Sequence, residues 1–176
     1  MTFNTTPLPL DLATVGNGKL LARKPLRPLD NLMRRLYVTQ EIADLLDGKI
    51  RRGAFPDFEA ERLIAIFCAG QFLRISRKKN NDLPDLEKLE GFDEVWALCP
   101  RKPKPGWRLL GRFIDKDRLI LLRAYDKHQL ARNYDKATKE VIGDWETILG
   151  TAQQPLRGAE LSDYLSGVYR DVDVKE

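Results

Sequence analysis

The sequence predicts an α+β fold in which a small antiparallel sheet packs against helices. Two β-rich runs, residues 107–115 and 119–125, flank a short charged turn, which is typical of a β-hairpin. Apolar residues recur at helical spacing over residues 57–73 and again over 134–149. The chain has 176 residues, 43% of them hydrophobic, which suits one domain with a substantial core and short extensions.

Residues 1–33 are predicted to be an irregular arm because four prolines, at positions 7, 9, 25 and 28, break helices and central strands. The N-terminus has neither the basic region nor the apolar stretch of a signal peptide. No run approaches the about 18 apolar residues that cross a bilayer. We therefore expect a soluble, cytoplasmic protein with no membrane partner.

The domain itself is predicted over residues 34–150. Residues 36–38 suit a short strand, and Thr39 precedes a short helix that ends near Gly48. A core helix is expected to begin at a cap formed by Asp57 and to carry its apolar stripe as far as Leu73. Phe58 and Phe72 are expected to widen that stripe.

The second half predicts a three-stranded meander, formed by residues 94–100, 107–115 and 119–125. Together with the N-terminal strand it would make the small antiparallel sheet. Side chains alternate between the faces of a strand, so Arg108 and Arg112 should project from one face. The helix over 134–149 should bury Trp145 against this sheet.

Residues 151–176 are predicted to be a helical extension with an acidic tail. Residues 158–176 should either fold back over the basic part of the domain or pack as a helix on the far side of the core with a frayed acidic end. In both cases one apolar stripe would be unfavourable to leave in water. That stripe consists of Leu161, Tyr164, Leu165 and Val168.

Charge is distributed unevenly along the chain. The net charge of the chain is +4. Residues 100–136 hold 11 Lys or Arg against 4 Asp or Glu, a net charge of +7. The rest of the chain holds 19 basic and 22 acidic residues, a net charge of −3. This asymmetry indicates either a polyanionic partner or a solvated charged face. Cys68 and Cys99 lack CxxC spacing, so we expect structural thiols in a reducing compartment and no zinc site. No phosphate loop, GxSxG or HExxH motif occurs, which leaves nucleotide hydrolysis and zinc proteolysis without support.

Over residues 35–149 the order of elements resembles the RelE/ParE-like superfamily of toxins from bacterial toxin–antitoxin pairs. The resemblance rests on a leucine and glycine passage, an aromatic-Arg-Leu strand start, a lysine after the last strand and an alanine in the final helix. These are Leu86, Leu89, Gly91, Trp107, Arg108, Leu109, Lys127 and Ala137. The resemblance implies a RelE-like fold, a partner antitoxin protein, and metal-independent cleavage of RNA, including ribosome-bound mRNA, without a cofactor.

In such a reaction the ribose 2′-hydroxyl attacks the adjacent phosphate, which requires proton transfer and cations. The resemblance implies catalytic roles for Arg108, His128 and Tyr134. It also implies RNA binding by Arg112 and Lys127. Some ribonuclease members carry catalytic residues on the strand before the hairpin. Here that strand has no lysine, and three basic residues of the loop that follows it could take their place. These are Arg101, Lys102 and Lys104.

Alternatives stay open at this point. Arg108 could instead pair with an acid such as Glu94, His128 could be an ordinary surface histidine, and Tyr134 could belong to the core. The three tryptophans are expected to be core anchors, although Trp107 could stack on a base. At the level of the protein, the alternatives are a ParE-like protein that inhibits DNA gyrase and a non-toxic binding module of a phage or mobile element.

Overall fold

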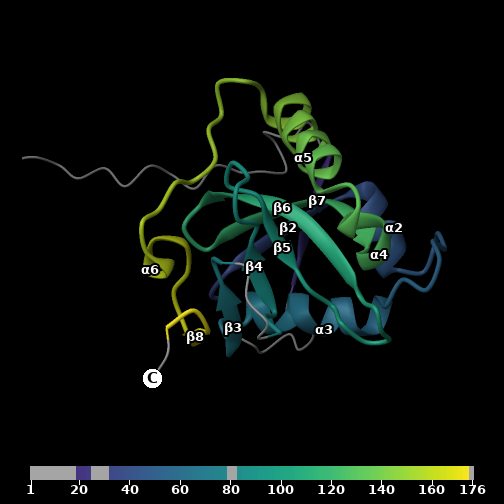
Figure 1. Ribbon diagram of the computed structural model, residues 1–176, viewed down its shortest axis with the longest axis horizontal. Coiled ribbons are helices and arrows are strands. Elements are labelled where there is room, and N and C mark those ends of the chain that lie inside the picture. Colours follow the sequence, from purple (N-terminus) through teal and green to yellow (C-terminus); the bar gives the residue numbers. More distant parts are fainter. Residues whose placement is uncertain (1–18, 25–31, 79–82, 175–176) are drawn as a thin grey trace, which may run out of the picture.

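The computed structural model describes residues 19–24, 32–78 and 83–174, which form one mixed sheet with helices on both faces (Figure 1). The strand order is β1-β2-β7-β6-β5-β4-β3-β8. Neighbouring strands are antiparallel, except that β2 runs parallel to β7, and β3 runs parallel to β4 and β8. The strands are β1 (Leu20–Arg23), β2 (Arg35–Thr39), β3 (Leu73–Ser76), β4 (Leu86–Lys88), β5 (Trp96–Leu98), β6 (Trp107–Asp115), β7 (Arg118–Asp126) and β8 (Tyr169–Asp171).

The predicted α+β class is confirmed, but the predicted small antiparallel sheet is wrong in size and in strand direction. The sequence did not reveal β3 and β4 because they are only 4 and 3 residues long, and because β3 pairs on one side with β8 from the distant end of the chain. Within the arm that was expected to be irregular, residues 20–23 form β1, which pairs with β2. The four prolines of that arm lie outside the described residues.

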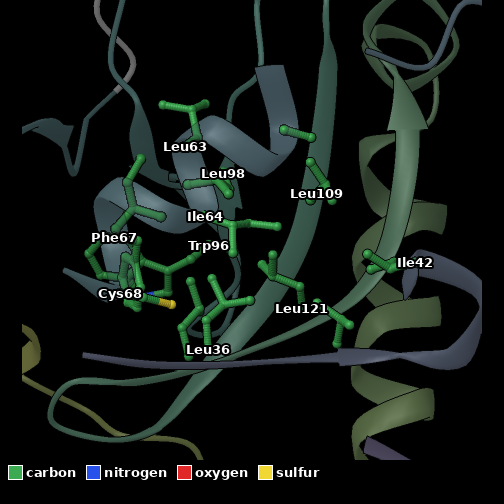
Figure 2. Packing of buried hydrophobic residues seen from close by; sticks show 14 of the residues in the cluster. Leu36, Ile42, Leu63, Ile64, Phe67, Cys68, Trp96, Leu98, Leu109 and Leu121 are labelled. Atoms are coloured by element: carbon green, nitrogen blue, oxygen red, sulfur yellow. The ribbon is translucent and has the colours of Figure 1, made fainter. Parts of the chain in front are cut away.

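One face of the sheet packs against α2 (Gln40–Leu46) and α3 (Asp57–Cys68). We call this packing the α3-side core. It joins Ile42 of α2 and Phe67 of α3 to alternate residues of the central strands, such as Leu109 and Leu121 (Figure 2). Burial of these apolar side chains is the main force that holds the helices to the sheet.

The predicted extent of the second helix needs three corrections. Its N-cap residue is Pro56, and Asp57 is the first helical residue. The helix ends at Cys68 because the chain then turns at Gly70, whose φ is 68°, and continues into β3. Phe58 and Phe72 do not widen the apolar stripe, since Phe58 is 79% exposed and Phe72 is 52% exposed.

The other face is covered by α4 (Lys127–Ala131) and α5 (Tyr134–Leu149), which form the α5-side core (Figure 1). Trp145 is buried there as predicted, and its indole N–H donates to the Gln153 carbonyl at 2.7 Å. Trp96 and Trp107 are also buried, so all three tryptophans are core anchors. Trp107 contacts Phe55 in a T-shaped arrangement and the Arg52 guanidinium at 5.6 Å, and it is only 4% exposed, so it has no face available for a base.

The β6–β7 hairpin contains a bulge that redirects part of its charge. Leu110 is opposite Arg123, whereas Gly111 is opposite Leu121, so β7 has one extra residue at this point. Consequently Leu122 and Arg123 both face α5. A Cβ at Gly111 would lie 1.8 Å from the Ile120 carbonyl oxygen, so the close approach of the two strands requires glycine here.

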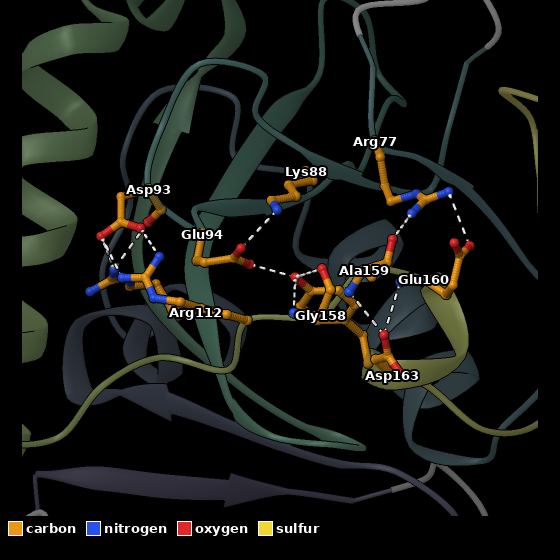
Figure 3. Close-up of polar contacts among 11 residues, drawn as sticks. Arg77, Lys88, Asp93, Glu94, Arg112, Gly158, Ala159, Glu160 and Asp163 are labelled. Atoms are coloured by element: carbon orange, nitrogen blue, oxygen red, sulfur yellow. Dashed lines mark hydrogen bonds and ion pairs between the residues drawn. The ribbon is translucent and has the colours of Figure 1, made fainter.

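The segment after Gly150 is built into the same core and is not a separate tail. Leu161, Tyr164 and Leu165 are buried in the α3-side core, and β8 pairs with β3. The Tyr164 hydroxyl donates to Glu94 at 2.7 Å, and Glu94 also accepts from the Lys88 ammonium at 2.8 Å (Figure 3).

The segment folds back and packs on the core, as the second alternative expects, but its acidic residues do not cover the basic side chains of the meander. Its helix, α6, covers only Leu161–Tyr164, and Val168 is 58% exposed. The acidic residues Glu160 and Asp171 instead pair with Arg77, next to β3, at 3.9 and 3.3 Å (Figure 3 shows the first pair). Opposite charge therefore attaches the segment to the far edge of the sheet.

Candidate nucleic-acid interface

Exposed basic side chains gather where β7 meets α4. One backbone contact joins α4 to the preceding loop, and the Asp126 side chain caps the helix. The Lys127 amide donates to the Gly106 carbonyl at 3.1 Å, and Asp126 accepts from the His128 amide at 2.8 Å, so α4 begins beside the β5–β6 loop. The exposed basic side chains of these segments are Lys102, Lys104, Lys127, His128, Arg132 and Lys136, and the exposed acid Asp135 lies beside the last of them.

An open cleft of about 720 Å³ separates α4 from the start of α5. His128 and Arg132 line one wall, and Lys136 lines the other. Two cations and a histidine around one open space can bind a phosphate and exchange a proton with it. We call this site the α4–α5 cleft.

Glu140 is the only carboxylate among the described residues that line the cleft, and its charge is compensated. It accepts from the Tyr125 hydroxyl at 2.6 Å and lies 3.3 Å from Arg123 and 4.0 Å from Lys136. Burial, followed by the hydrogen bond to Glu140, raises the pKa of Tyr125, which therefore stays protonated. Arg132 and Lys136 therefore line the cleft together with one carboxylate whose charge is shared among several partners.

Arg108 and Arg112 share one face of β6, as the alternation predicts, but this face lies under α5. Each arginine is only 3% exposed. Arg108 donates to Glu87 at 3.1 Å, while Arg112 donates to Asp93 at 3.1 Å and stacks over the Trp145 ring at 5.3 Å. The expected basic sheet face is therefore an internal layer of paired charge, because these strands are covered on both sides.

The acid that pairs with Arg108 is Glu87, not Glu94. Glu94 is occupied by Lys88 and Tyr164. Neither arginine of β6 is open to a polyanion in this arrangement.

Tyr134 lies at the start of α5, half-buried, with its ring stacked on Phe92 at a centroid distance of 6.3 Å. Burial, then the neighbouring Glu87 charge, raises its pKa, while Arg108 acts in the opposite direction. Among the described residues, no hydrogen bond or ion pair joins the His128 side chain to Arg108 or Tyr134. The structure brings Tyr134 near Arg108, whereas His128 belongs to the α4–α5 cleft.

The loop residues divide in the same way. Arg101 is half-buried and donates twice to the Pro84 carbonyl, at 3.1 and 2.8 Å, so it holds the loop in place. Lys102 and Lys104 are exposed, as is Lys127 on α4.

Sequence reasoning missed Arg132 and Lys136 as members of the interface. A signal was available, because His128, Arg132 and Lys136 recur at intervals of four, the spacing of one helical face. The break between α4 and α5 obscured it, since neither helix alone contains the three residues.

No protein-family model matches the chain, and no curated protein and no solved structure matches it either. None of the helices that the structure describes is long and apolar enough to span a membrane. In residues 19–24, 32–78 and 83–174 no group of three or more His, Cys, Asp or Glu side chains is placed to hold a metal ion. Cys68 and Cys99 are buried free thiols, and burial raises the pKa of Cys68 to about 12.

Proposed function

We propose that this chain is a toxin-like RNA-binding protein that holds single-stranded RNA at the α4–α5 cleft and cleaves it without a metal ion. One observation carries the proposal: three exposed basic residues, His128, Arg132 and Lys136, line one open cleft, and Lys127 precedes them on α4. Such a cluster, with its charge free to meet phosphates, is the electrostatic footprint of a nucleic-acid binder.

The order of elements supports a RelE-like architecture for the central part. A strand and two helices (β2, α2, α3) precede the meander β5-β6-β7, and α4 and α5 follow it. The additional strands β1, β3, β4 and β8 extend this unit on both sides.

In the proposed reaction the 2′-oxygen of one nucleotide attacks the phosphorus and the bond to the 5′-oxygen breaks. The products are a 2′,3′-cyclic phosphate and a 5′-hydroxyl. His128 takes the proton of the 2′-hydroxyl and returns a proton to the leaving 5′-oxygen. Arg132 and Lys136 stabilise the additional negative charge on the phosphate.

A second candidate is favoured by the burial of Arg108. The resemblance assigns this arginine to the phosphate, yet it is 3% exposed and paired with Glu87. This arrangement favours a non-toxic relative that binds RNA and does not cut it.

The test is incubation of purified protein with labelled RNA in EDTA, together with binding measured at low salt. We expect cleavage that His128→Ala abolishes and binding that the pair Arg132→Ala and Lys136→Ala weakens about tenfold or more. Binding without cleavage would select the second candidate. Inhibition of DNA gyrase with no RNA binding would contradict both and support the ParE-like alternative.

A further inference from the structure

A second groove lies on the other side of the start of α5. Two overlapping cavities, of about 470 and 590 Å³, share five lining residues and form one continuous space. We call it the Phe92 groove. The shared residues are Lys78, Lys88, Leu89, Glu90 and Phe92.

Aromatic rings form one wall of the groove. Phe92 and Tyr134 are stacked with an interplanar angle of 21° and a centroid distance of 6.3 Å. Both rings are half-buried, so each presents part of its surface to the groove. Planar bases bind to such surfaces because every base has a π-face that stacks on an aromatic side chain.

Glu87 supplies a directional acceptor at the same wall. Its Oε1 atom accepts from Arg108 and from the Cys99 thiol, while no described residue donates to its Oε2 atom. A carboxylate oxygen in this position accepts a hydrogen bond from an exocyclic amino group. It repels the carbonyl oxygens that flank the single N–H of uracil.

Two lysines line the groove together with the carboxylates of Glu87 and Glu90. The Lys78 side chain is exposed, and no described residue pairs with its ammonium group. Lys88 has its ammonium group 2.8 Å from Glu94, so it adds positive potential and not a free donor. A phosphate next to a base held by the rings would therefore meet Lys78.

The two sites are neighbours in the chain and in space. Asn133 and Lys136 line the α4–α5 cleft, and Tyr134, between them in sequence, lines the Phe92 groove. A strand of RNA that passes over the first turn of α5 would reach both.

We infer that the Phe92 groove binds one nucleobase of single-stranded RNA, stacked on Phe92 and Tyr134, and selects bases with an exocyclic amino group over uracil. This inference rests on the proposed function, because the α4–α5 cleft supplies most of the phosphate contacts. It adds a site of base selection that the basic cluster alone cannot provide, since phosphate contacts do not read sequence.

The test compares fluorescein-labelled octanucleotides that are all uridine with octanucleotides carrying one central adenosine, cytidine or guanosine. Anisotropy at low salt should show that the amino-bearing octamers bind about fivefold more tightly, the effect of one hydrogen bond to a base edge. Phe92→Leu should weaken their binding about tenfold by removing a stacking ring, while Phe92→Tyr, the matched control, should keep it.

Glu87→Gln should reduce the preference over uridine. Because Glu87 also pairs with the buried Arg108, the melting temperature of the Glu87→Gln variant is measured as well. The Phe92 variants test the site independently of this ion pair. Equal binding of all octamers that Phe92→Leu does not change would overturn the inference and leave the proposed function standing. Absence of binding to every octamer would overturn both.

Discussion

The buried arginines of β6 and β7 and the exposed basic residues around α4 come from the same stretch of sequence but do opposite things. Arg108 and Arg112 are each 3% exposed and are paired with Glu87 and Asp93 from other segments. Lys102, Lys104 and Lys127 are exposed and lie on loops or on a short helix. The first group holds the sheet and its loops together, whereas the second is available to a partner.

The difference teaches that a net charge read along the sequence cannot be assigned to a surface until its partners are known. The acids that neutralise Arg108 and Arg112 lie 21 and 19 residues earlier in the chain, outside the basic segment. Arg123 is likewise held by Asp144 and Glu140 of α5. The exposed positive charge of residues 100–136 is therefore carried by lysines and by Arg132.

Loss of the ring that covers the internal arginines should have the largest effect. Trp145→Ala removes a fully buried side chain that packs against Arg112 and hydrogen-bonds to Gln153. We expect the free energy of unfolding to fall by about 3–5 kcal/mol, measured by urea denaturation. Phe58→Ala is the control, because Phe58 is 79% exposed and its loss should change stability little. Equal stability of the two variants would mean that α5 does not pack on the sheet by this face.

A second experiment separates the two groups of basic residues by stability. Arg108→Ala leaves Glu87 without its partner and should lower the free energy of unfolding by about 3 kcal/mol, the low end for a broken buried pair, since Glu87 keeps partial contact with water. Lys104→Ala, at an exposed position, should change it by less than about 0.5 kcal/mol. Similar values for both would remove the distinction between internal and exposed charge.

The third prediction concerns the exposed group and its dependence on salt. If the α4–α5 cleft and its neighbouring loop contact phosphates, log K for RNA should fall linearly with log salt. Replacing Lys102 and Lys104 together by Ala should reduce that slope by about 2, one for each lost phosphate contact. Lys116→Ala is a matched control, because Lys116 is equally exposed but lies in the turn at the opposite end of β6 and β7. An unchanged slope in the double variant would mean that the loop does not touch RNA.

Local patterns predicted the parts of the fold that local forces determine. The β6–β7 hairpin and the buried face of α5 follow from alternation and helical spacing within one segment. The edge strands were not predictable in this way. β8 is 3 residues long, and it is a strand because β3, nearly 100 residues earlier, offers it a free edge.

The candidate site was predictable in residue type but not in arrangement. His128, Lys102 and Lys127 were identified from the sequence and lie at one exposed end of the sheet. Arg108 was also identified, but its burial depends on Glu87 and on the position of α5, which only tertiary structure reveals. Long-range pairing thus decides which of two similar arginines or lysines is free.

The smallest expected effect is the loss of stability at low pH. It tests Asp93, the carboxylate that pairs with Arg112. Hydrogen bonds from Arg157, and then the charges of Arg157 and Arg112, hold the pKa of Asp93 below its ordinary value. A carboxylate with a lowered folded-state pKa stabilises the fold above the unfolded value, about 3.9, and loses this contribution as the pH falls through the folded value. Because Asp93 is half-exposed, solvent screens the interaction and the contribution is modest. The free energy of unfolding should therefore decrease more steeply between about pH 4 and pH 3 in the wild type than in Asp93→Asn, with the two curves parallel from pH 5 to 7. Parallel curves over the whole range would show that neither Arg157 nor Arg112 stabilises the Asp93 carboxylate in the folded protein, and Arg108 with Glu87 would then be the ion pair that holds β6.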